Sequence, residues 1–228
     1  MSDTMTPRAT LCWTDFQVDA VILAAGDFPC HPVPSALLDH PRVVCCDSAA
    51  EAFLQSRRAL WRCIGDGDSL PESVKRDLPF SHVAEQETND LTKAVRLVVE
   101  ELGADARVAI IGATGKREDH TIVNISLLAE YLRIGLRATM LTDHGVFLPC
   151  RGSRVFTPAD FHPACDTLQG RDLSIFNLTC RTLASEGLQY DVYPFRQWWQ
   201  GTLNRILSPT FRITADGDYL VYLRYFED

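Results

Sequence analysis

The sequence lacks several features that would place it in a large class of proteins. No apolar run approaches the ~20 residues that span a bilayer, and no basic start precedes a short apolar segment. The formal net charge of −8 leaves no surplus of Lys and Arg. This charge excludes the basic surface that neutralises nucleic-acid phosphates. We therefore expect a soluble protein that is not exported and binds neither nucleic acid nor membranes.

The sequence also lacks CxxC motifs, which are typical of metal and redox sites. None of the eight cysteines belongs to a CxxC motif, and several lie in apolar stretches, where a free cysteine behaves as a small hydrophobic residue. We interpret them as reduced thiols, which predicts a cytoplasmic protein. With 46% hydrophobic residues in 228, the chain is long enough to bury a core without disulfides.

The first two thirds of the chain alternate between two patterns. Short runs apolar on both faces are typical of parallel strands covered by helices, and they fall at 18–25, 42–46, 61–65, 107–112 and 137–142. Segments with helical spacing lie between them, at 48–57, 89–102 and 118–135. This alternation predicts a doubly wound α/β domain with a parallel sheet over residues 18–145.

The pattern changes near residue 150. Short β-prone pieces are separated by Gly, Pro, Asp and Asn, and long helical stretches disappear. Residues 215–219, ADGDY, lie between two alternating runs and predict a hairpin with Asp216-Gly217 as its turn. We expect a second, all-β sandwich domain over residues 150–228.

Carboxylates recur where the predicted parallel strands end. In an open α/β sheet, ligands bind outside the carboxyl ends of the strands. Several like charges gathered there repel, and a divalent cation removes that cost. Oxygen ligands without a His or Cys cluster favour Mg²⁺, which typically joins carboxylates to substrate phosphates. The candidate metal and phosphate residues are Asp47, Asp66, Asp68 and Asp90.

Each of these positions also has a purely structural interpretation. An Asp before a helix is more often an N-cap, and an Asp-Gly pair is more often a turn, so any one position taken alone favours that interpretation. Their recurrence at strand ends favours a metal-phosphate site. Spacing alone does not name the reaction.

The stretch GATGKREDH, residues 112–120, is a Gly-rich turn into a helix. It is not a Walker A motif, because Ile110 stands where a glycine is required and Arg117 where Ser or Thr is required. Its backbone N–H groups and its cations Lys116 and Arg117 would suit an anion. A tight turn with solvated basic residues is an equally good interpretation of this stretch by itself.

Several motifs together resemble one family, the thiamine pyrophosphokinases. GDGDS (65–69) resembles that family's GDxDS, EQETNDLTK (85–93) its DQDxTDxTK, and GATGKREDH its GxxGGRxDH. VVCCDSAAEAFL (43–54) matches its aspartate followed by small residues and a helix. SEGLQYDV (185–192) and GTLNRILSPTF (201–211) are similar to its C-terminal elements GLxW and GTLxSxSN.

The resemblance implies an activity and an assembly. The diphosphate of ATP would pass to the hydroxyl of thiamine, giving thiamine diphosphate and AMP with Mg²⁺. An α/β domain and a β-sandwich domain would form a homodimer whose site lies between the α/β domain of one subunit and the sandwich of the other. It assigns the metal and phosphate cluster to Asp47, Asp66, Asp68 and Asp90, ATP contacts to Gln86, Lys93, Gly112, Gly115, Arg117 and Asp119, and the thiamine pocket to Tyr190, Asn204 and Ser208.

The sequence departs from the family pattern at several positions. Glu85, Glu87 and Asn89 replace two Asp and a Thr, and Tyr190 and Pro209 replace Trp and Asn. Lys116 replaces the second glycine of the GGR segment, which removes the option of a positive φ and adds a cation. A diphosphotransferase for another heterocyclic alcohol, such as a pterin, is one alternative. A regulatory module that binds nucleotide or thiamine without turnover is another.

Overall fold

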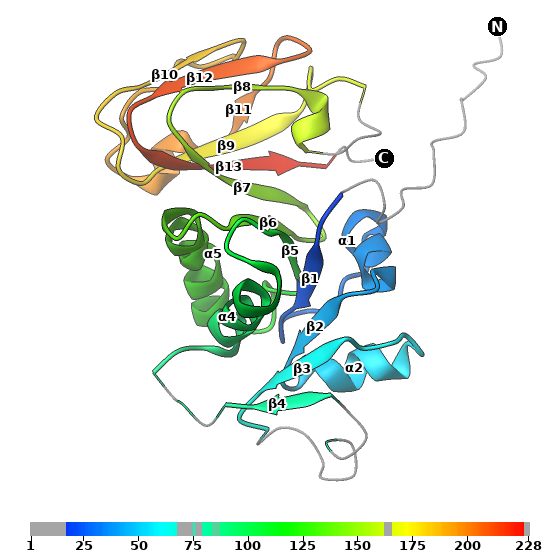
Figure 1. Cartoon of the computed structure of the whole chain (residues 1–228). Helices are drawn as coiled ribbons and strands as arrows, with labels where there is room; N and C mark the ends of the chain where they lie inside the picture. Colours follow the sequence, from blue (N-terminus) through cyan, green and yellow to red (C-terminus); the bar gives the residue numbers. More distant parts are fainter. Residues whose placement is uncertain are drawn as a thin grey trace, which may run out of the picture.

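A computed structural model describes residues 17–67, 75, 79–83, 85, 87–161 and 166–225. Its described part contains a ten-stranded sheet in the order β11-β9-β13-β7-β6-β5-β1-β2-β3-β4 and a three-stranded sheet in the order β10-β12-β8. Figure 1 shows the parallel strands in the lower part of the molecule and the second sheet at the top. The α/β class predicted from the sequence is confirmed.

Six consecutive strands of the large sheet are parallel, and helices cover both of its faces. The strands are β1 (Ala20–Leu23), β2 (Val43–Cys46), β3 (Arg62–Gly65), β4 (Phe80–His82), β5 (Arg107–Ile111) and β6 (Arg137–Leu141). In Figure 1, α4 (Asp90–Leu102) and α5 (Glu118–Arg133) lie on one side of them. On the other side lie α1 (Pro32–Ala36), η2 (Leu37–Asp39) and α2 (Ala49–Gln55).

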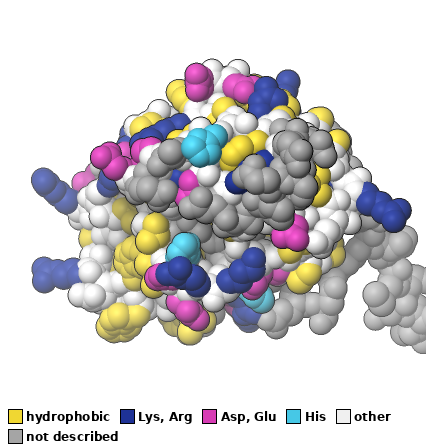
Figure 2. Space-filling model, turned by 90° about the horizontal axis from the view of Figure 1, so that it is seen from below, with side chains coloured by type: hydrophobic (Ala, Val, Ile, Leu, Met, Phe, Trp, Pro, Cys, Tyr) yellow, Lys and Arg dark blue, Asp and Glu magenta, His cyan; other side chains and the backbone are white. Residues whose placement is uncertain are grey.

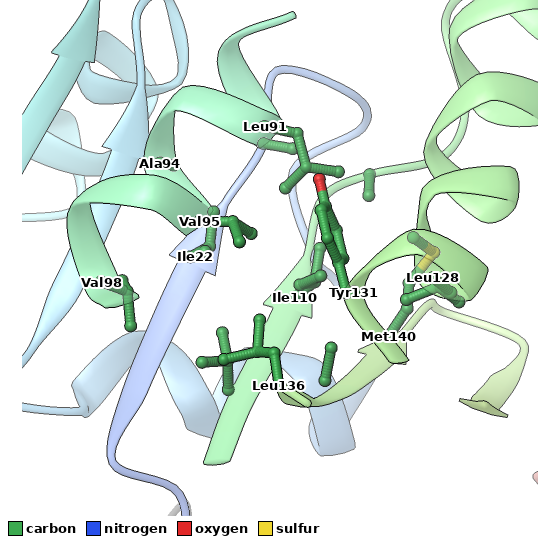
Figure 3. Packing of buried hydrophobic residues seen from close by; sticks show 14 of the residues in the cluster. Ile22, Leu91, Ala94, Val95, Val98, Ile110, Leu128, Tyr131, Leu136 and Met140 are labelled. Atoms are coloured by element: carbon green, nitrogen blue, oxygen red, sulfur yellow. The ribbon is translucent and has the colours of Figure 1, made fainter. Parts of the chain in front are cut away.

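The strand side chains alternate between two apolar cores. Ala20 and Ile22 of β1 pack into the core under α4 and α5, and Val21 and Leu23 into the core under α1 and α2. Figure 3 shows the first core, where residues of both long helices meet above β1 and β5. Burying each Val, Ile or Leu side chain contributes about 1.5–3 kcal/mol, which explains why these runs are apolar at every position.

The C-terminal strands form two antiparallel layers. β7 (Gly145–Arg151) pairs with β6, so the large sheet continues into β13 (Asp218–Arg224), β9 (Asp172–Asn177) and β11 (Asn204–Arg205). The second layer contains β8 (Arg154–Phe156), β10 (Leu183–Glu186) and β12 (Phe211–Ala215), with η3 (Pro158–Asp160) and η4 (Trp198–Gly201) in the connections. A third apolar core fills the space between the layers. The domain boundary expected at residues 145–150 stays a prediction. In the structure, the pairing of β6 with β7 joins the two parts into one sheet.

The hairpin predicted at residues 215–219 is wrong. β12 and β13 belong to different sheets, so the Asp216-Gly217 turn carries the chain from one layer to the other. The Asp216 carboxylate accepts hydrogen bonds from the N–H groups of Arg181 and Thr182, at 2.9 and 2.8 Å. The turn is held by a neighbouring loop, and sequence alternation does not reveal that partner.

Candidate active site

The candidate site lies at the carboxyl edge of the parallel strands. The order β3-β2-β1-β5-β6 puts the reversal of chain direction across the sheet between β1 and β5, which is where open α/β sheets bind ligands. Five features lie at this edge: the end of β3, Asp47 after β2, the start of α4, the Gly-rich turn after β5, and a cavity beside β6.

Asp47, the first residue after β2, is strained and buried. Its φ is 31°, in the left-handed region that Asp tolerates better than most residues, and its exposed fraction is 5%. Gly65 makes room for it, because a Cβ on Gly65 would lie 2.8 Å from the Asp47 Cβ. Oδ1 of Asp47 is buried and has no hydrogen-bond partner among the described residues. A buried carboxylate oxygen without a partner is costly, and a bound cation would remove that cost.

Asp90 opens helix α4 and has a buried lysine as its partner. The Asn89 side chain caps the helix by accepting a hydrogen bond from the Thr92 N–H at 3.0 Å. Nζ of Lys93, whose side chain is 3% exposed, lies 3.1 Å from Oδ1 of Asp90. The pair therefore fixes one carboxylate and one cation at the start of the helix.

The charges of Asp47 and Asp90 both act on two buried thiols, Cys46 and Cys63. Burial raises the pKa of Cys46 well above its usual range, and the charges of Asp90 and Asp47 raise it further. Burial likewise raises the pKa of Cys63 to about 12, again with help from Asp47 and Asp90. Both thiols stay protonated and unreactive at neutral pH.

The remaining acidic candidates are only partly described. Asp66 follows β3 directly, is half-buried, and precedes Gly67, whose φ of 77° turns the chain. Asp68 and Gln86 lie outside the described residues. Within the described ranges, no group of three His, Cys, Asp or Glu side chains is arranged to hold a metal ion. The four-aspartate cluster therefore stays a prediction.

The Gly-rich turn after β5 is joined to the loop after β1. Gly112 and Gly115 have φ values of 62° and 79°, and a Cβ on Gly115 would lie 1.9 Å from Oδ2 of Asp27. The Gly26 N–H donates to the Gly112 carbonyl at 2.7 Å. Lys116 was not expected to adopt a positive φ, and this expectation is wrong, because its φ is 55°. Its Nζ donates to the Ala25 carbonyl at 3.0 Å, a contact that offsets the conformational cost.

Arg117 and Asp119 face solvent beside this turn. Their side chains form an ion pair at 2.5 Å and are 66% and 61% exposed. The hydrogen bond from Arg117 holds the pKa of Asp119 below its ordinary value. Among the described residues, neither side chain has a buried partner that fixes its position, so both are available to a ligand.

A cavity of about 190 Å³ opens on the other side of the Gly-rich turn, and sequence reasoning missed most of it. Its walls are formed by residues that follow β1 and β5, by the end of β6 and the residues after it, and by α1: Asp27, Pro29, Pro34, Gly112, Thr114, Gly115, Leu141, Thr142, Asp143 and His144. The available signal was that Thr142 ends the predicted run 137–142 and that Asp143 and His144 directly follow it.

Asp143 fastens the loop after β1 to this cavity. Its Oδ1 accepts hydrogen bonds from the N–H groups of Cys30 and His31, and its Oδ2 accepts one from the Cys30 thiol at 3.0 Å. Burial raises the pKa of Asp143, but these bonds outweigh burial and lower it below the ordinary value. No described residue donates a hydrogen bond to the carboxylate of Asp27, which lines the same cavity.

The three residues expected at the thiamine pocket lie in the sandwich. The buried Asn204 side chain bonds both backbone groups of Tyr190, accepting from its N–H at 3.0 Å and donating to its carbonyl at 2.8 Å. Ser208 is half-buried and its hydroxyl donates to the Thr210 carbonyl. In Figure 1 the sandwich strands lie at the opposite end of the molecule from β2 and β3. One chain therefore does not bring these residues to Asp47.

The surface seen in Figure 2 agrees with the charge of the sequence. Lys and Arg side chains on this face lie in small groups mixed with Asp, Glu and His, and the described residues there form no broad basic area. None of the helices in the described part of the chain has the length and apolar character that crossing a bilayer requires.

Comparisons with solved structures show the same fold in named enzymes. Thiamine pyrophosphokinase from Bacillus subtilis aligns with a TM-score of 0.71 and 17% identity, covering 92% of this chain and 100% of that one. The Candida albicans thiamin pyrophosphokinase gives a TM-score of 0.74 at 16% identity, covering 94% and 91%. The yeast enzyme gives 0.70 at 15% identity, covering 99% and 94%. Among curated proteins, none gives a significant match.

Family models match both parts of the chain. The thiamin pyrophosphokinase catalytic domain matches residues 34–140, which contain the acidic residues and the Gly-rich turn. The thiamin pyrophosphokinase substrate-binding domain matches residues 145–222, which contain most of the sandwich. The two models describe parts of one enzyme and together account for most of the sequence. The chain belongs to the thiamine pyrophosphokinase family.

Proposed function

We propose that this protein transfers the diphosphate of ATP to the hydroxyl of thiamine. The hydroxyl oxygen forms a bond to the β-phosphorus, the bond from that phosphorus to the α–β bridging oxygen breaks, AMP leaves, and the hydroxyl proton is lost. The observation that carries the proposal is that the buried carboxylate of Asp47 and a Gly-rich turn lie at the same edge of a chain that matches both domains of the family. Such a reaction depends mainly on positioning and charge neutralisation.

Mg²⁺ is the metal that these residues suit. Asp47, Asp66 and Asp90 would hold it, together with Asp68, which lies outside the described residues. The unpartnered Oδ1 of Asp47 supports this assignment. Mg²⁺ typically takes only one or two carboxylates, with substrate phosphates and water as its other ligands, so a three-carboxylate cage is not required. The bound ion would neutralise charge on the transferring phosphates.

The groups along this edge favour one orientation of ATP. Its phosphates need a cation, which Asp47 and Asp90 would hold, and N–H donors, which the Gly-rich turn would supply. The cavity beyond that turn has two carboxylates, Asp27 and Asp143, which repel phosphate but accept hydrogen bonds from hydroxyl and amino groups. We place the nucleoside part of ATP in this cavity and its phosphates toward α4, where Lys93 and Gln86 would orient them and Arg117 and Asp119 would contact the nucleotide.

A second copy of the chain would complete the thiamine side of the site. Within one chain, Tyr190, Asn204 and Ser208 lie in the sandwich, away from the acidic edge. Their segment also exposes six large apolar side chains: Tyr190, Tyr193, Trp198, Trp199, Leu203 and Leu207. Exposed apolar side chains in such numbers are typical of an interface. We propose a homodimer in which the sandwich of one subunit faces the acidic edge of the other.

The direct test is a reaction of purified protein with ATP, MgCl₂ and thiamine, followed by chromatography for thiamine diphosphate and AMP. Equal amounts of both products are expected. Absence of both would refute the activity, and AMP formed only with another heterocyclic alcohol would move the assignment to that acceptor. Tyr190, which stands where the family has Trp, makes this second outcome worth including.

The buried, unpaired cysteines of the described chain support a cytoplasmic location.

A further inference from the structure

Two asparagine side chains connect the start of α4 to the Gly-rich turn. Oδ1 of Asn89 accepts a hydrogen bond from the Thr92 N–H at 3.0 Å. Nδ2 of Asn89 donates to Oδ1 of Asn124 at 3.3 Å, and Nδ2 of Asn124 donates to the Ala113 carbonyl at 2.8 Å. In each bond the donor lies nearer to α4 and the acceptor nearer to the Gly-rich turn. The series begins in the first turn of α4, passes through Asn124 of α5, and ends at the loop that precedes α5.

Each end of this connection touches a part of the candidate site. Asn89 directly precedes Asp90, and its cap orients the turn that carries both Asp90 and Lys93. Ala113 lies between Gly112 and Gly115 in the turn proposed to receive phosphates. Asn124 is only 9% exposed, so water has little access to replace its bonds. The pair therefore fixes the position of the acidic carboxylate relative to the phosphate turn.

The residue type at position 89 matters for this connection. A capping side chain needs one acceptor, which Thr and Asn both supply. Asn89 supplies that acceptor and still has an amide donor for Asn124, on the other atom of the same group. The family that this chain resembles has Thr at this position. A hydroxyl on a shorter side chain keeps the cap but lacks the second, separately directed amide group.

We propose that Asn89 and Asn124 are positioning residues that couple the Asp90–Lys93 pair to the Gly-rich turn, and that this chain gains the coupling from Asn at position 89. The proposal rests on the proposed function for its kinetic consequence. Its structural part does not depend on activity: breaking either amide bond releases residues 112–117 from α4.

The experiment compares Asn89→Thr, Asn124→Leu and the double variant in the full chain. The first readout is hydrogen exchange of backbone amides 112–117 without ligand, where we expect roughly tenfold faster exchange in each variant. The second is steady-state kinetics, where kcat should fall ~10–100-fold while KM for thiamine is unchanged. Because both residues serve one connection, the double variant should lose no more than Asn124→Leu alone.

Asn89→Thr keeps the proposal testable even if Asn124→Leu fails to fold, because Asn89 is only half-buried and Thr preserves the cap. Asn177→Ala is the matched control. Asn177 also bonds two carbonyls, of Cys180 and Phe195, but lies in β9, so its loss should leave exchange at 112–117 unchanged.

Three results would overturn the proposal. They are unchanged exchange at residues 112–117 in Asn89→Thr, an equal change in the Asn177→Ala control, and strictly additive kinetic losses in the double variant. A wild-type protein without diphosphotransferase activity would refute the proposed function instead. In that case the exchange experiment would still decide whether the amide connection exists.

Discussion

The carboxyl edge of the parallel sheet and the sandwich differ in how they treat their polar side chains. At the edge, Asp47 is held in a left-handed conformation with a buried oxygen that has no described partner, and Lys93 is buried beside Asp90. In the sandwich, Asn204 bonds both backbone groups of Tyr190, and the aromatic side chains nearby face solvent. Strained and unpaired groups mark a place that needs a ligand, whereas satisfied groups with exposed apolar neighbours mark a place that needs a partner.

The variant with the largest expected effect is Asp47→Asn, which tests whether the carboxyl edge needs the charge of Asp47. Asn tolerates the left-handed φ and keeps the shape of the side chain, so only the charge is lost. We expect kcat to fall roughly 100- to 1000-fold. The free energy of unfolding without Mg²⁺ should not fall, because the change removes a charge from a buried oxygen that lacks a partner. Steady-state kinetics and chemical denaturation measure the two effects.

Asp39→Asn is the control for Asp47→Asn. Asp39 pairs with Arg58 on the surface, where its side chain is 56% exposed, and its loss should change neither quantity. MgCl₂ with an ATP analogue should raise the melting temperature of the wild type more than that of Asp47→Asn. An Asp47→Asn protein with full activity would reduce Asp47 to a turn residue.

A second comparison separates the two members of the ion pair on α4. Asp90→Asn leaves the Lys93 ammonium buried without its partner, so it should cost about 2 kcal/mol of stability as well as activity. Lys93→Met replaces a buried cation with an apolar side chain of similar length, so stability should hold while kcat falls ~10–100-fold. Equal losses of stability in both variants would contradict a role for Lys93 in orienting ATP.

The exposed apolar side chains of the sandwich lead to a prediction about dimerisation. Trp199, which is 74% exposed, belongs to the segment proposed as part of the dimer interface. Trp199→Glu should weaken dimerisation by ~30-fold or more, as loss of a central aromatic anchor does. Sedimentation over a concentration series measures it. Val155→Glu, an exposed apolar position on β8 in the same sandwich, should leave the dimer intact, and equal behaviour of the two variants would move the interface elsewhere.

Much of the fold follows from local pattern, and its exceptions have physical causes. Five of the six parallel strands were predicted because each is buried on both faces. The edge strand β4 was not, since it is three residues long and only partly buried. Helix α1 was missed because PVPSA contains two prolines that suit only a first turn. The Asp216-Gly217 turn was assigned to a hairpin because local sequence does not say which sheet the next strand joins.

The site divides in the same way. Asp47, Asp66 and Asp90 were recognisable because they directly follow strands or begin a helix. The cavity at Thr142–His144 and the bond from Asn124 to Ala113 depend on which strands are neighbours in space. The positive φ of Lys116 depends on a carbonyl 91 residues away, at Ala25. The bond from Asn124 and the contact of Lys116 carry no local signal in one sequence.

A smaller effect distinguishes Tyr190, which we propose contacts thiamine, from Asn204, which holds the Tyr190 backbone. Tyr190 is 58% exposed, so Tyr190→Ala should raise KM for thiamine by about tenfold, through loss of a ring that we propose faces the thiazolium cation, with little change in stability. Asn204 is 7% exposed, so Asn204→Ala should instead cost about 1–3 kcal/mol by leaving the Tyr190 backbone groups unpaired. Tyr190→Phe keeps the ring and should behave as wild type. A stability loss in Tyr190→Ala without a change in KM would make Tyr190 structural.

The weakest effect concerns acid stability at the cavity. The bonds from Cys30 and His31 leave the pKa of Asp143 lowered in the folded protein. A carboxyl with a depressed folded pKa stabilises the protein above its unfolded pKa of about 3.9, and this stabilisation is lost as the pH falls through the folded value. Asp143→Asn should therefore be less stable than wild type at pH 6, and the difference should shrink below about pH 4. Denaturation curves from pH 6 to 2 measure this difference, and a gap that stays constant would show that the charge of Asp143 does not hold the loop after β1.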